Sequence, residues 1–428
     1  MAKPGITEVE NAFQPAKEVN SSERFAGRKS AVADAYFGLI AEGAHIAIVG
    51  NRGIGKTSLA RQVLNISRGD NSLLNKLGLV NDRELDFLPV YFACGATVKN
   101  TTDLLERLLT SSSCLADWLY DIPKASKEIR GYTPKFGGNV FGIEASLGGE
   151  KKTELTAERA LSAHSIDTVF TNALAAVVEQ GLSRDGILIV IDEFDQITDP
   201  TGFASFLKAL STNVPKVKFC IVGVAQDIQY LMKEHQSSDR LFAGTIISLP
   251  SMSAAELGEI VAIAESSLNN YLSFNNEAVA RIVELAQGHP YMVHLIGKYA
   301  LRTAYSSGDL IITAALIDDT LRSIAERAAD PVLEARYKKA VASSEQREIV
   351  LKSLAETQAP DGEIWTTNAY KIALEQGVDN SSQYVGQLVT DEYGSEVEKL
   401  RERYYRFHDS LFAAYVRARP RLVTKSVA

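Results

Sequence analysis

Five short apolar runs, separated by segments with helical periodicity, dominate the first 250 residues of the chain. The runs cover residues 46–49, 87–93, 186–191, 217–222 and 245–249. Helical patterns lie between them, over residues 101–109, 166–180 and 202–210. Strands that alternate with helices in this way predict βαβ units and a mostly parallel sheet in a three-layer α/β fold. The run at 186–191 is apolar throughout, which is typical of a central strand buried on both faces.

Helical patterns fill the chain after residue 252. Ser253 and Glu256 form an S-x-x-E capping box, which predicts the start of a helix. Further apolar-periodic segments cover residues 276–286, 291–304 and 310–324. Three short helix patterns (344–356, 367–375 and 381–389), a predicted hairpin (396–400 and 403–407) and a closing helix (410–417) follow. This last order of elements is typical of a winged helix.

These patterns divide the chain into four parts. We expect a flexible N-terminal segment (1–21), an α/β core (22–251), a helical lid (252–332) and a winged-helix-like domain (333–428). Within the core, the stretch 134–152 is rich in glycine, and we interpret about 124–155 as an inserted loop or hairpin. Two interpretations of this insertion stay open, a solvated connection or an element that contacts a partner or substrate.

A phosphate-binding sequence follows the first predicted strand. It matches G-x-x-x-x-G-K-T and consists of Gly50, Asn51, Arg52, Gly53, Ile54, Gly55, Lys56 and Thr57, with Ser58 next in the following helix. The glycines let the backbone wrap a phosphate chain, so that N–H groups and the positive end of the helix point at it. Lys56 would reach the β- and γ-phosphates, and the Thr57 hydroxyl would bind Mg²⁺. The sequence therefore predicts a site for a nucleoside triphosphate, ATP, with Mg²⁺.

Two carboxylates end the apolar run at 186–191. Asp192 and Glu193 should emerge at the carboxyl end of a central strand, where ligands of doubly wound sheets bind. Asp192 suits the Mg²⁺ shell, and Glu193 is placed to orient or deprotonate an attacking water. Because a small-molecule kinase must exclude water, this pair favours hydrolysis of ATP over transfer to a small acceptor.

Length, charge and cysteine content limit the classes of protein to which the chain can belong. The 428 residues suffice for two or three domains, and the net charge of −8 argues against a protein that coats nucleic acid, although a local basic patch stays open. Cys94, Cys114 and Cys220 are scattered, which favours reduced, buried thiols. The chain has no apolar run long enough for a bilayer, and its N-terminus lacks the apolar core of a signal peptide. We expect a cytoplasmic protein with no membrane contact.

Beyond these two motifs, the chain resembles AAA+ ATPases of the branch that joins origin-recognition ATPases and STAND signalling ATPases. The resemblance rests on an F-x-G-R segment ending at Arg28, the G-x-R-G-x-G-K-T form of the loop, a Ser-Ser-Asp-Arg segment ending at Arg240, a G-x-P element ending at Pro290, and a Y-R-F-x-D-x-L-F tail over 405–412. It implies that Arg28 and Pro290 lie at the base and ribose, and that Arg240 acts as an arginine finger on a neighbouring subunit. It also implies ATP-dependent self-association.

The chain departs from the family pattern at both sensors. No clear first sensor follows the strand at 217–222, where Gln226 is the nearest amide able to touch a γ-phosphate. The Gly-Ala-Arg form of the second sensor is replaced by Gly-His-Pro at 288–290. These departures favour slow, regulated hydrolysis.

The sequence leaves two functions open. One is an ATP-driven switch associated with DNA through the winged helix, in replication, transposition or a mobile element. The other is a signalling or defence ATPase whose nucleotide state gates assembly or a partner protein. The candidate recognition helix (380–387) contains no Lys or Arg, which weakens the first, whereas Lys399, Arg401, Arg403 and Arg406 lie near the predicted wing.

Overall fold

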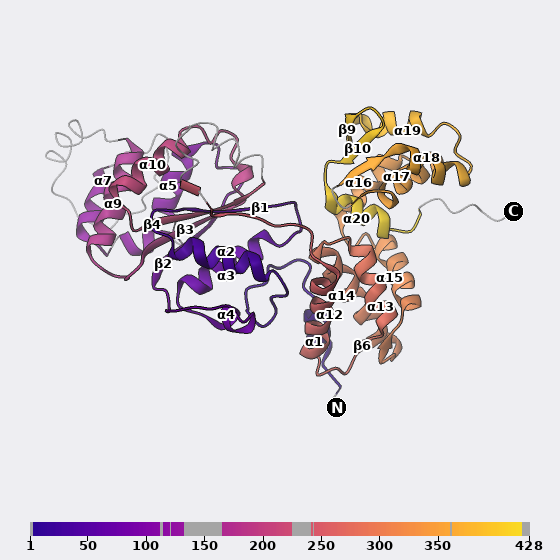
Figure 1. The fold of residues 1–428 in the computed structure, drawn as a ribbon, viewed down its shortest axis with the longest axis horizontal. Coiled ribbons are helices and arrows are strands. Elements are labelled where there is room, and N and C mark those ends of the chain that lie inside the picture. Colours follow the sequence, from indigo (N-terminus) through magenta and orange to yellow (C-terminus); the bar gives the residue numbers. More distant parts are fainter. Residues whose placement is uncertain are drawn as a thin grey trace, which may run out of the picture.

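The computed structural model describes residues 3–111, 114–119, 121–131, 165–224, 241–242, 244–359 and 362–421. In Figure 1 an α/β core lies on the left, a helical lid at the lower right and a winged-helix domain above the lid. The predicted architecture, a mostly parallel sheet between helical layers followed by a helical lid and a winged helix, is confirmed.

Five strands form the central sheet in the order β2-β3-β4-β1-β5. They are β1 (Ile46–Val49), β2 (Phe87–Ala93), β3 (Gly186–Asp192), β4 (Val217–Gly223) and β5 (Ile246–Ser248). Every pairing among them is parallel, so all five carboxyl ends lie at one edge of the sheet. The loop after β1 therefore opens beside the ends of β3 and β4, which is where a doubly wound sheet binds its ligands.

Helices cover both faces of this sheet because alternate strand residues point to opposite sides. Ile48 and Val190 pack under the first layer, and Ile189 and Ile191 under the second. The first layer holds α2 (Lys29–Ile40), α3 (Lys56–Ser67) and α4 (Ser72–Lys76). The second holds α5 (Thr101–Thr110), α6 (Ala116–Leu119), α7 (Pro123–Gly131), α9 (Ile166–Glu179) and α10 (Phe203–Asn213).

Part of the expected insertion is helical. Residues 124–131 belong to α7, which packs against α9. The glycine-rich stretch at 134–152 lies outside the described residues. No helix in the described part of the chain is both long and apolar enough to span a membrane.

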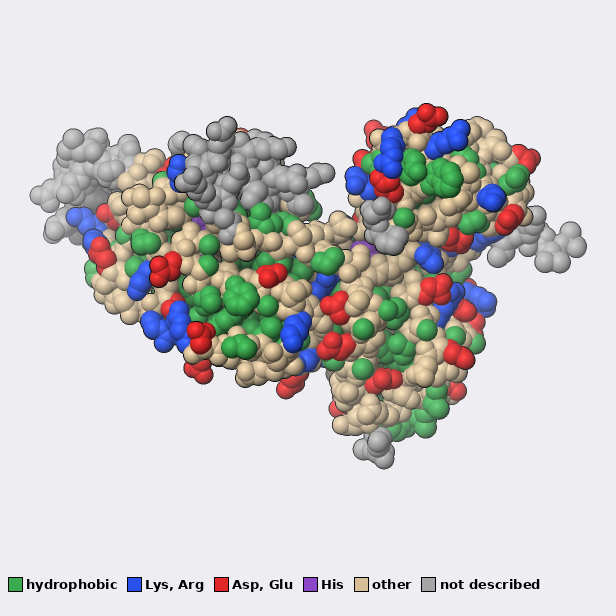
Figure 2. Space-filling view, in the orientation of Figure 1, with side chains coloured by type: hydrophobic (Ala, Val, Ile, Leu, Met, Phe, Trp, Pro, Cys, Tyr) green, Lys and Arg blue, Asp and Glu red, His purple; other side chains and the backbone are tan. Residues whose placement is uncertain are grey.

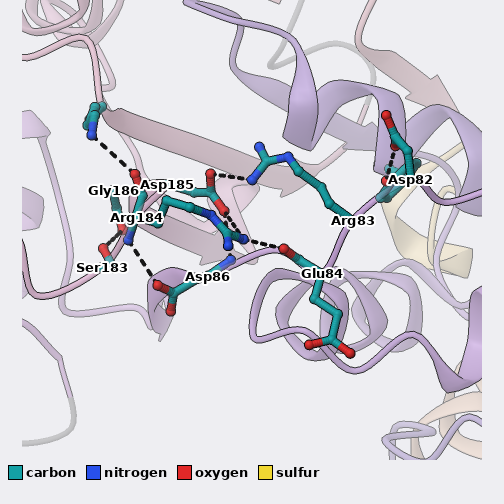
Figure 3. A network of polar contacts seen from close by, with 10 residues as sticks. Asp82, Arg83, Glu84, Asp86, Ser183, Arg184, Asp185 and Gly186 are labelled. Carbon is teal, nitrogen blue, oxygen red and sulfur yellow. Dashed lines mark hydrogen bonds and ion pairs between the residues drawn. The ribbon is translucent and has the colours of Figure 1, made fainter.

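A network of charged side chains joins the amino ends of β2 and β3, at the edge of the sheet away from the phosphate-binding loop (Figure 3). The Arg184 N–H donates to the Asp86 carboxylate at 2.9 Å, and the Asp86 N–H donates to Asp185 Oδ2 at 2.8 Å. Arg83 Nη1 lies 2.7 Å from Asp185 Oδ1. Next to this network Gly186 has φ +99°, and a Cβ there would stand 2.0 Å from the Lys216 carbonyl oxygen, so only glycine fits.

The lid and the winged helix share one continuous apolar core. The lid contains α12 (Ala254–Ser267), β6 (Ser273–Phe274), α13 (Asn276–Ala286), α14 (Pro290–Ser307), β7 (Ile311–Ile312) and α15 (Ala314–Glu326). The winged helix contains α16 (Pro331–Val341), α17 (Glu345–Glu356), β8 (Glu363–Trp365), α18 (Thr366–Glu375), α19 (Ser381–Leu388), η3 (Asp391–Tyr393), β9 (Val397–Arg401), β10 (Tyr404–Phe407) and α20 (Ser410–Ala418). Helix α20 packs on α13 and α14, so the last helix of the chain joins the two units.

Candidate active site

The phosphate-binding loop connects β1 to α3. Gly53 (φ +71°) and Gly55 (φ +100°) have left-handed backbones that other residues rarely adopt, and α3 begins directly at Lys56. The first-turn N–H groups of α3 have no carbonyl partner within the helix, so they are available to an anion. A Cβ at Gly55 would meet no atom within 4 Å, so the loop backbone faces open space.

Lys56 folds back over this loop. Its Nζ donates to the carbonyl oxygens of Gly50 at 2.9 Å and Asn51 at 3.0 Å. Burial lowers the pKa of Lys56, and the nearby carboxylates of Asp195 and Asp192 oppose that shift. The ammonium group is therefore held within the loop, where a phosphate chain would meet it.

Asp192 ends β3 and is almost fully buried, with 2% of its surface exposed. Its Oδ2 accepts from the Tyr91 hydroxyl at 2.7 Å, and its Oδ1 accepts from the Glu193 N–H at 2.8 Å. Glu193 has a left-handed backbone (φ +54°), and its side chain is exposed. The carboxylate of Asp192 is thus fixed, whereas that of Glu193 faces solvent.

A cavity of about 790 Å³ brings the two motifs together. The loop residues 52–58, Asp192 and Glu193 form its polar side, and Met252 and Ile260 contribute apolar walls from the lid. The volume is in the range of sites for small molecules and cofactors. A hydroxyl (Thr57), a carboxylate (Asp192), an ammonium and open backbone N–H groups are the donor set that suits a phosphate chain with Mg²⁺. The residues present fit such a ligand.

The sequence did not predict a fixed path for residues 4–20, of which 14–19 line this cavity. We call residues 4–20 the N-terminal strap. Helix α1 (Ile6–Ala12) packs on the lid, and Phe13 is fully buried against Gly297, where a Cβ would stand 2.5 Å from the phenyl ring. The strap then crosses to α3, where the Val19 N–H donates to Ser58 Oγ at 3.0 Å. The expected flexible lead-in is therefore ordered, and residues 14–19 form a wall of the cavity.

Arg28 lines the cavity, and its hydrogen bonds join two segments beside it. Its guanidinium donates to the carbonyl oxygens of Ile54 at 3.0 Å and Pro250 at 2.6 Å, and its N–H donates to Glu256 at 2.7 Å. Through these bonds Arg28 connects the phosphate-binding loop to the start of the lid. Each terminal nitrogen keeps a second N–H group, and the expected place of Arg28 at the base stays a prediction.

The other expected site residues divide into two groups. Pro290 is the first residue of α14 and lines the cavity, and its place at the base and ribose stays a prediction. Gly288 before it has φ +82°, and a Cβ there would stand 2.4 Å from Ser251. Gln226 and Arg240 lie outside the described residues, so their predicted roles stay predictions.

Comparison with known proteins shows that solved structures share the fold of this chain. No protein-family model matches the chain, and no curated protein matches it either. The Walker-type ATPase PABY2304 of Pyrococcus abyssi is 15% identical and has a TM-score of 0.52, over 95% of this chain and 99% of that one. The chain therefore shares its fold with that protein. Two other solved structures match with lower scores: the ORC2 protein of Aeropyrum pernix (TM-score 0.48, 16% identity, 95% of both chains) and Cdc6p of Pyrobaculum aerophilum (0.45, 14%, 95% and 96%).

The winged helix of this chain reaches the phosphate-binding loop. A Cβ at Gly53 would stand 3.0 Å from Cδ2 of Leu411, in the first turn of α20, and 3.4 Å from Cβ of Tyr291. Leu411 is 4% exposed. The tip of the loop is therefore in contact with both the lid and the C-terminal domain.

Charges on the wing are largely paired. Arg401 forms two bonds to the Glu363 carboxylate, at 2.8 and 2.6 Å, and Arg406 bonds to Glu398 at 2.9 Å. Lys399 and Arg403 are exposed. Figure 2 shows basic and acidic side chains interspersed on the visible face of this domain. The wing therefore does not present a continuous positive surface.

Proposed function

We propose that this protein binds ATP with Mg²⁺, hydrolyses it slowly, and uses the nucleotide state to control the position of its winged helix. The contact between Gly53 and Leu411 is the observation that carries the proposal. A phosphate chain in the loop would change the surroundings of Gly53, and Leu411 would transmit the change to α20. A ligand shifts such an equilibrium only by its different affinity for the two arrangements, and the proposal assigns that difference to this contact.

The chemistry follows from the residues that line the cavity. Loop N–H groups and Lys56 would bind the phosphates, and Thr57 with Asp192 would hold Mg²⁺, which neutralises charge that develops on the phosphates. Glu193 would accept a proton from the attacking water. The supporting observation is that the Asp192 carboxylate is held by two hydrogen bonds, whereas Glu193 faces solvent.

Nucleotide titration tests the binding step. Lys56→Ala removes the ammonium group from the loop, and we expect it to abolish binding of a fluorescent ATP analogue. Lys124→Ala is the matched control, because Lys124 of α7 is an exposed lysine that pairs with Glu179 of α9, and neither residue lines the cavity. Equal affinity in Lys56→Ala and the wild type, with both proteins folded, would show that the loop does not bind the phosphates.

The winged helix of the switch binds either DNA or a partner protein. We call these the first and the second output, and our leading proposal is DNA. If the wing contacts DNA phosphates, Lys399 and Arg403 are exposed cations that stand outside the ion pairs of Arg401 and Arg406. Replacing both by alanine should then reduce the slope of log K against log salt by about 2. ATP-dependent self-association through Arg240 belongs to the same proposal, and light scattering with an ATP analogue tests it.

The paired charges favour the second output, a partner protein. Arg401 and Arg406 already bond to glutamates of the wing, and Trp365 beside them is 44% exposed. Tryptophan and arginine are enriched where proteins bind each other. A wild-type protein that shows no salt-dependent affinity for duplex DNA, with or without ATP, would favour this output over the first.

A further inference from the structure

Four side chains form a continuous path from the N-terminal strap to Asp192. Glu18 Oε1 lies 3.1 Å from Arg61 Nη2, and the Arg61 guanidinium carbon lies 3.5 Å above the centre of the Tyr91 ring. The Tyr91 hydroxyl then donates to Asp192 Oδ2 at 2.7 Å. The four residues come from the strap, α3, β2 and β3, and all of them line the cavity.

The register of the sheet places Tyr91 for this contact. Ala93 pairs with Asp192 across β2 and β3, so Tyr91 lies two residues earlier on the same face of β2. The Glu193 N–H donates to the other oxygen of Asp192, so both carboxylate oxygens are held by a hydrogen bond. Each oxygen still keeps a lone pair for water or a cation.

Two contacts hold the guanidinium of Arg61 in this path, one with Glu18 and one with the Tyr91 ring. Its Nε is buried and has no hydrogen-bond partner within the described chain, so the ion pair with Glu18 and the face of Tyr91 determine where its guanidinium lies. A guanidinium above an aromatic face is attracted by the ring quadrupole, which disfavours movement of the ring. The strap is thus connected, through one stacked pair, to the hydroxyl that holds Asp192.

We infer that Tyr91 is a positioning residue for the Asp192 carboxylate, and that Glu18 and Arg61 make its orientation depend on the N-terminal strap. The inference rests on the proposed function, because it assigns Tyr91 a role in how that site takes Mg²⁺. Hydrogen-bond partners of metal ligands commonly set metal affinity, and their loss lowers it by about 10–100-fold. The strap would therefore tune the Mg²⁺ requirement of nucleotide binding.

The primary test is Tyr91→Phe, which keeps the ring under Arg61 and removes only the hydroxyl. Binding of a fluorescent ATP analogue is measured in EDTA and then across a Mg²⁺ titration. We expect the affinity in EDTA to stay within about twofold of the wild type, and the Mg²⁺ midpoint to rise about tenfold or more. Tyr36→Phe is the matched control, because the Tyr36 hydroxyl donates to Asp82 at 3.1 Å and neither residue lines the cavity.

A second variant tests the link to the strap without altering the core. Glu18→Gln keeps the shape of the side chain and removes its charge, and we expect a smaller rise of the Mg²⁺ midpoint in the same direction. Combining it with Tyr91→Phe should add nothing further, since residues that act through one path are non-additive. Glu179→Gln, which breaks an exposed ion pair elsewhere, is the control for loss of one surface charge.

The outcomes separate this inference from the proposed function. A wild-type protein that binds no nucleotide would overturn both. A wild-type protein that binds nucleotide, with an unchanged Mg²⁺ midpoint in Tyr91→Phe, would overturn the role of Tyr91 alone. A raised midpoint in Tyr91→Phe with none in Glu18→Gln would remove the strap from the path.

Discussion

The Tyr291 hydroxyl donates to the Asp330 carboxylate at 2.5 Å. Tyr291 lines the cavity from the start of α14, and Asp330 caps α16, the first helix of the winged helix, by accepting from the N–H groups of Val332 and Leu333. The phosphate-binding loop meets the winged helix directly, where Gly53 lies against Leu411. Two contacts from opposite ends of that domain therefore meet beside the phosphate-binding loop.

Leu411→Ala should loosen the second contact. If α20 retains the nucleotide by packing on Gly53, the dissociation rate of a fluorescent ADP analogue should rise about tenfold, which corresponds to 1.4 kcal/mol. Stopped-flow displacement measures it, well below the melting temperature, because a buried Leu→Ala change also costs about 2–5 kcal/mol of stability. Leu374→Ala on α18 is the control, since Leu374 is 57% exposed. A folded Leu411→Ala protein with the wild-type dissociation rate would contradict the coupling.

Glu193→Gln should separate binding from hydrolysis. The amide keeps the size of the side chain but cannot accept the proton of water, so we expect phosphate release to slow by about 10²–10⁴. ATP affinity should stay close to the wild-type value, because Glu193 is exposed and the loop supplies the phosphate contacts. Steady-state phosphate release and analogue binding are measured on the same preparation. Unchanged turnover would exclude Glu193 as the base.

The two chemical motifs could be predicted from the sequence because each is local. A phosphate-binding loop needs its glycines, lysine and threonine within eight residues, and the Asp192–Glu193 pair directly follows a buried strand. Their meeting then follows from the parallel sheet, since both lie at the carboxyl ends of strands. The fold was predictable for the same reason, because strand and helix periodicity are properties of short segments.

The N-terminal strap and Arg28 could not be predicted in this way. The strap is ordered because Phe13 fills the space left by Gly297, almost three hundred residues away, and no local pattern encodes that fit. Arg28 lines the cavity, and its guanidinium bonds to the carbonyl oxygens of Ile54 and Pro250, two segments that only the fold brings together. The direction in which a side chain points depends on its three-dimensional neighbours.

Acid should destabilise the protein through two buried histidines. Burial lowers the pKa of His45, helped by the charge of Lys218, and burial likewise lowers that of His289, each to about 4. Between pH 4 and the ordinary value near 6.5 the unfolded chain binds more protons, so these groups contribute stability above 6.5 that is lost as the pH falls. Each can contribute a slope of about 1.4 kcal/mol per pH unit.

Urea unfolding at several pH values tests this dependence. The Phe219 N–H donates to His45 Nδ1 at 3.2 Å. His45→Asn keeps an acceptor for this N–H and removes the titrating ring. We expect its slope against pH to be shallower than the wild-type slope, even if its stability at pH 7 is lower. Leu374→Ala should leave the slope unchanged, because Leu374 carries no titrating group and is 57% exposed. Equal slopes in His45→Asn and the wild type would show that protonation of His45 does not contribute to the pH dependence of the free energy of unfolding.

Glu334→Gln should destabilise the winged helix more than any change of its surface ion pairs. Glu334 and Arg419 are 2% and 5% exposed, and they form two bonds of 2.8 Å, while the Tyr415 hydroxyl donates to Glu334 at 2.7 Å. Burial would raise the pKa of Glu334, but the bonds from Arg419 and Tyr415 outweigh it and lower the pKa.

Removing one charge of such a buried pair leaves the other without a counter-ion, and the expected cost is about 3–5 kcal/mol. Glu363→Gln breaks the exposed pair with Arg401 and should cost at most about 1 kcal/mol. Trp365 is a reporter within this domain, and a Trp118→Phe background makes it the sole tryptophan, so urea unfolding followed by its fluorescence compares the two variants directly. Similar midpoints would mean that the buried pair contributes no more to the winged helix than the exposed one, and α16 and α20 would then depend on apolar packing alone.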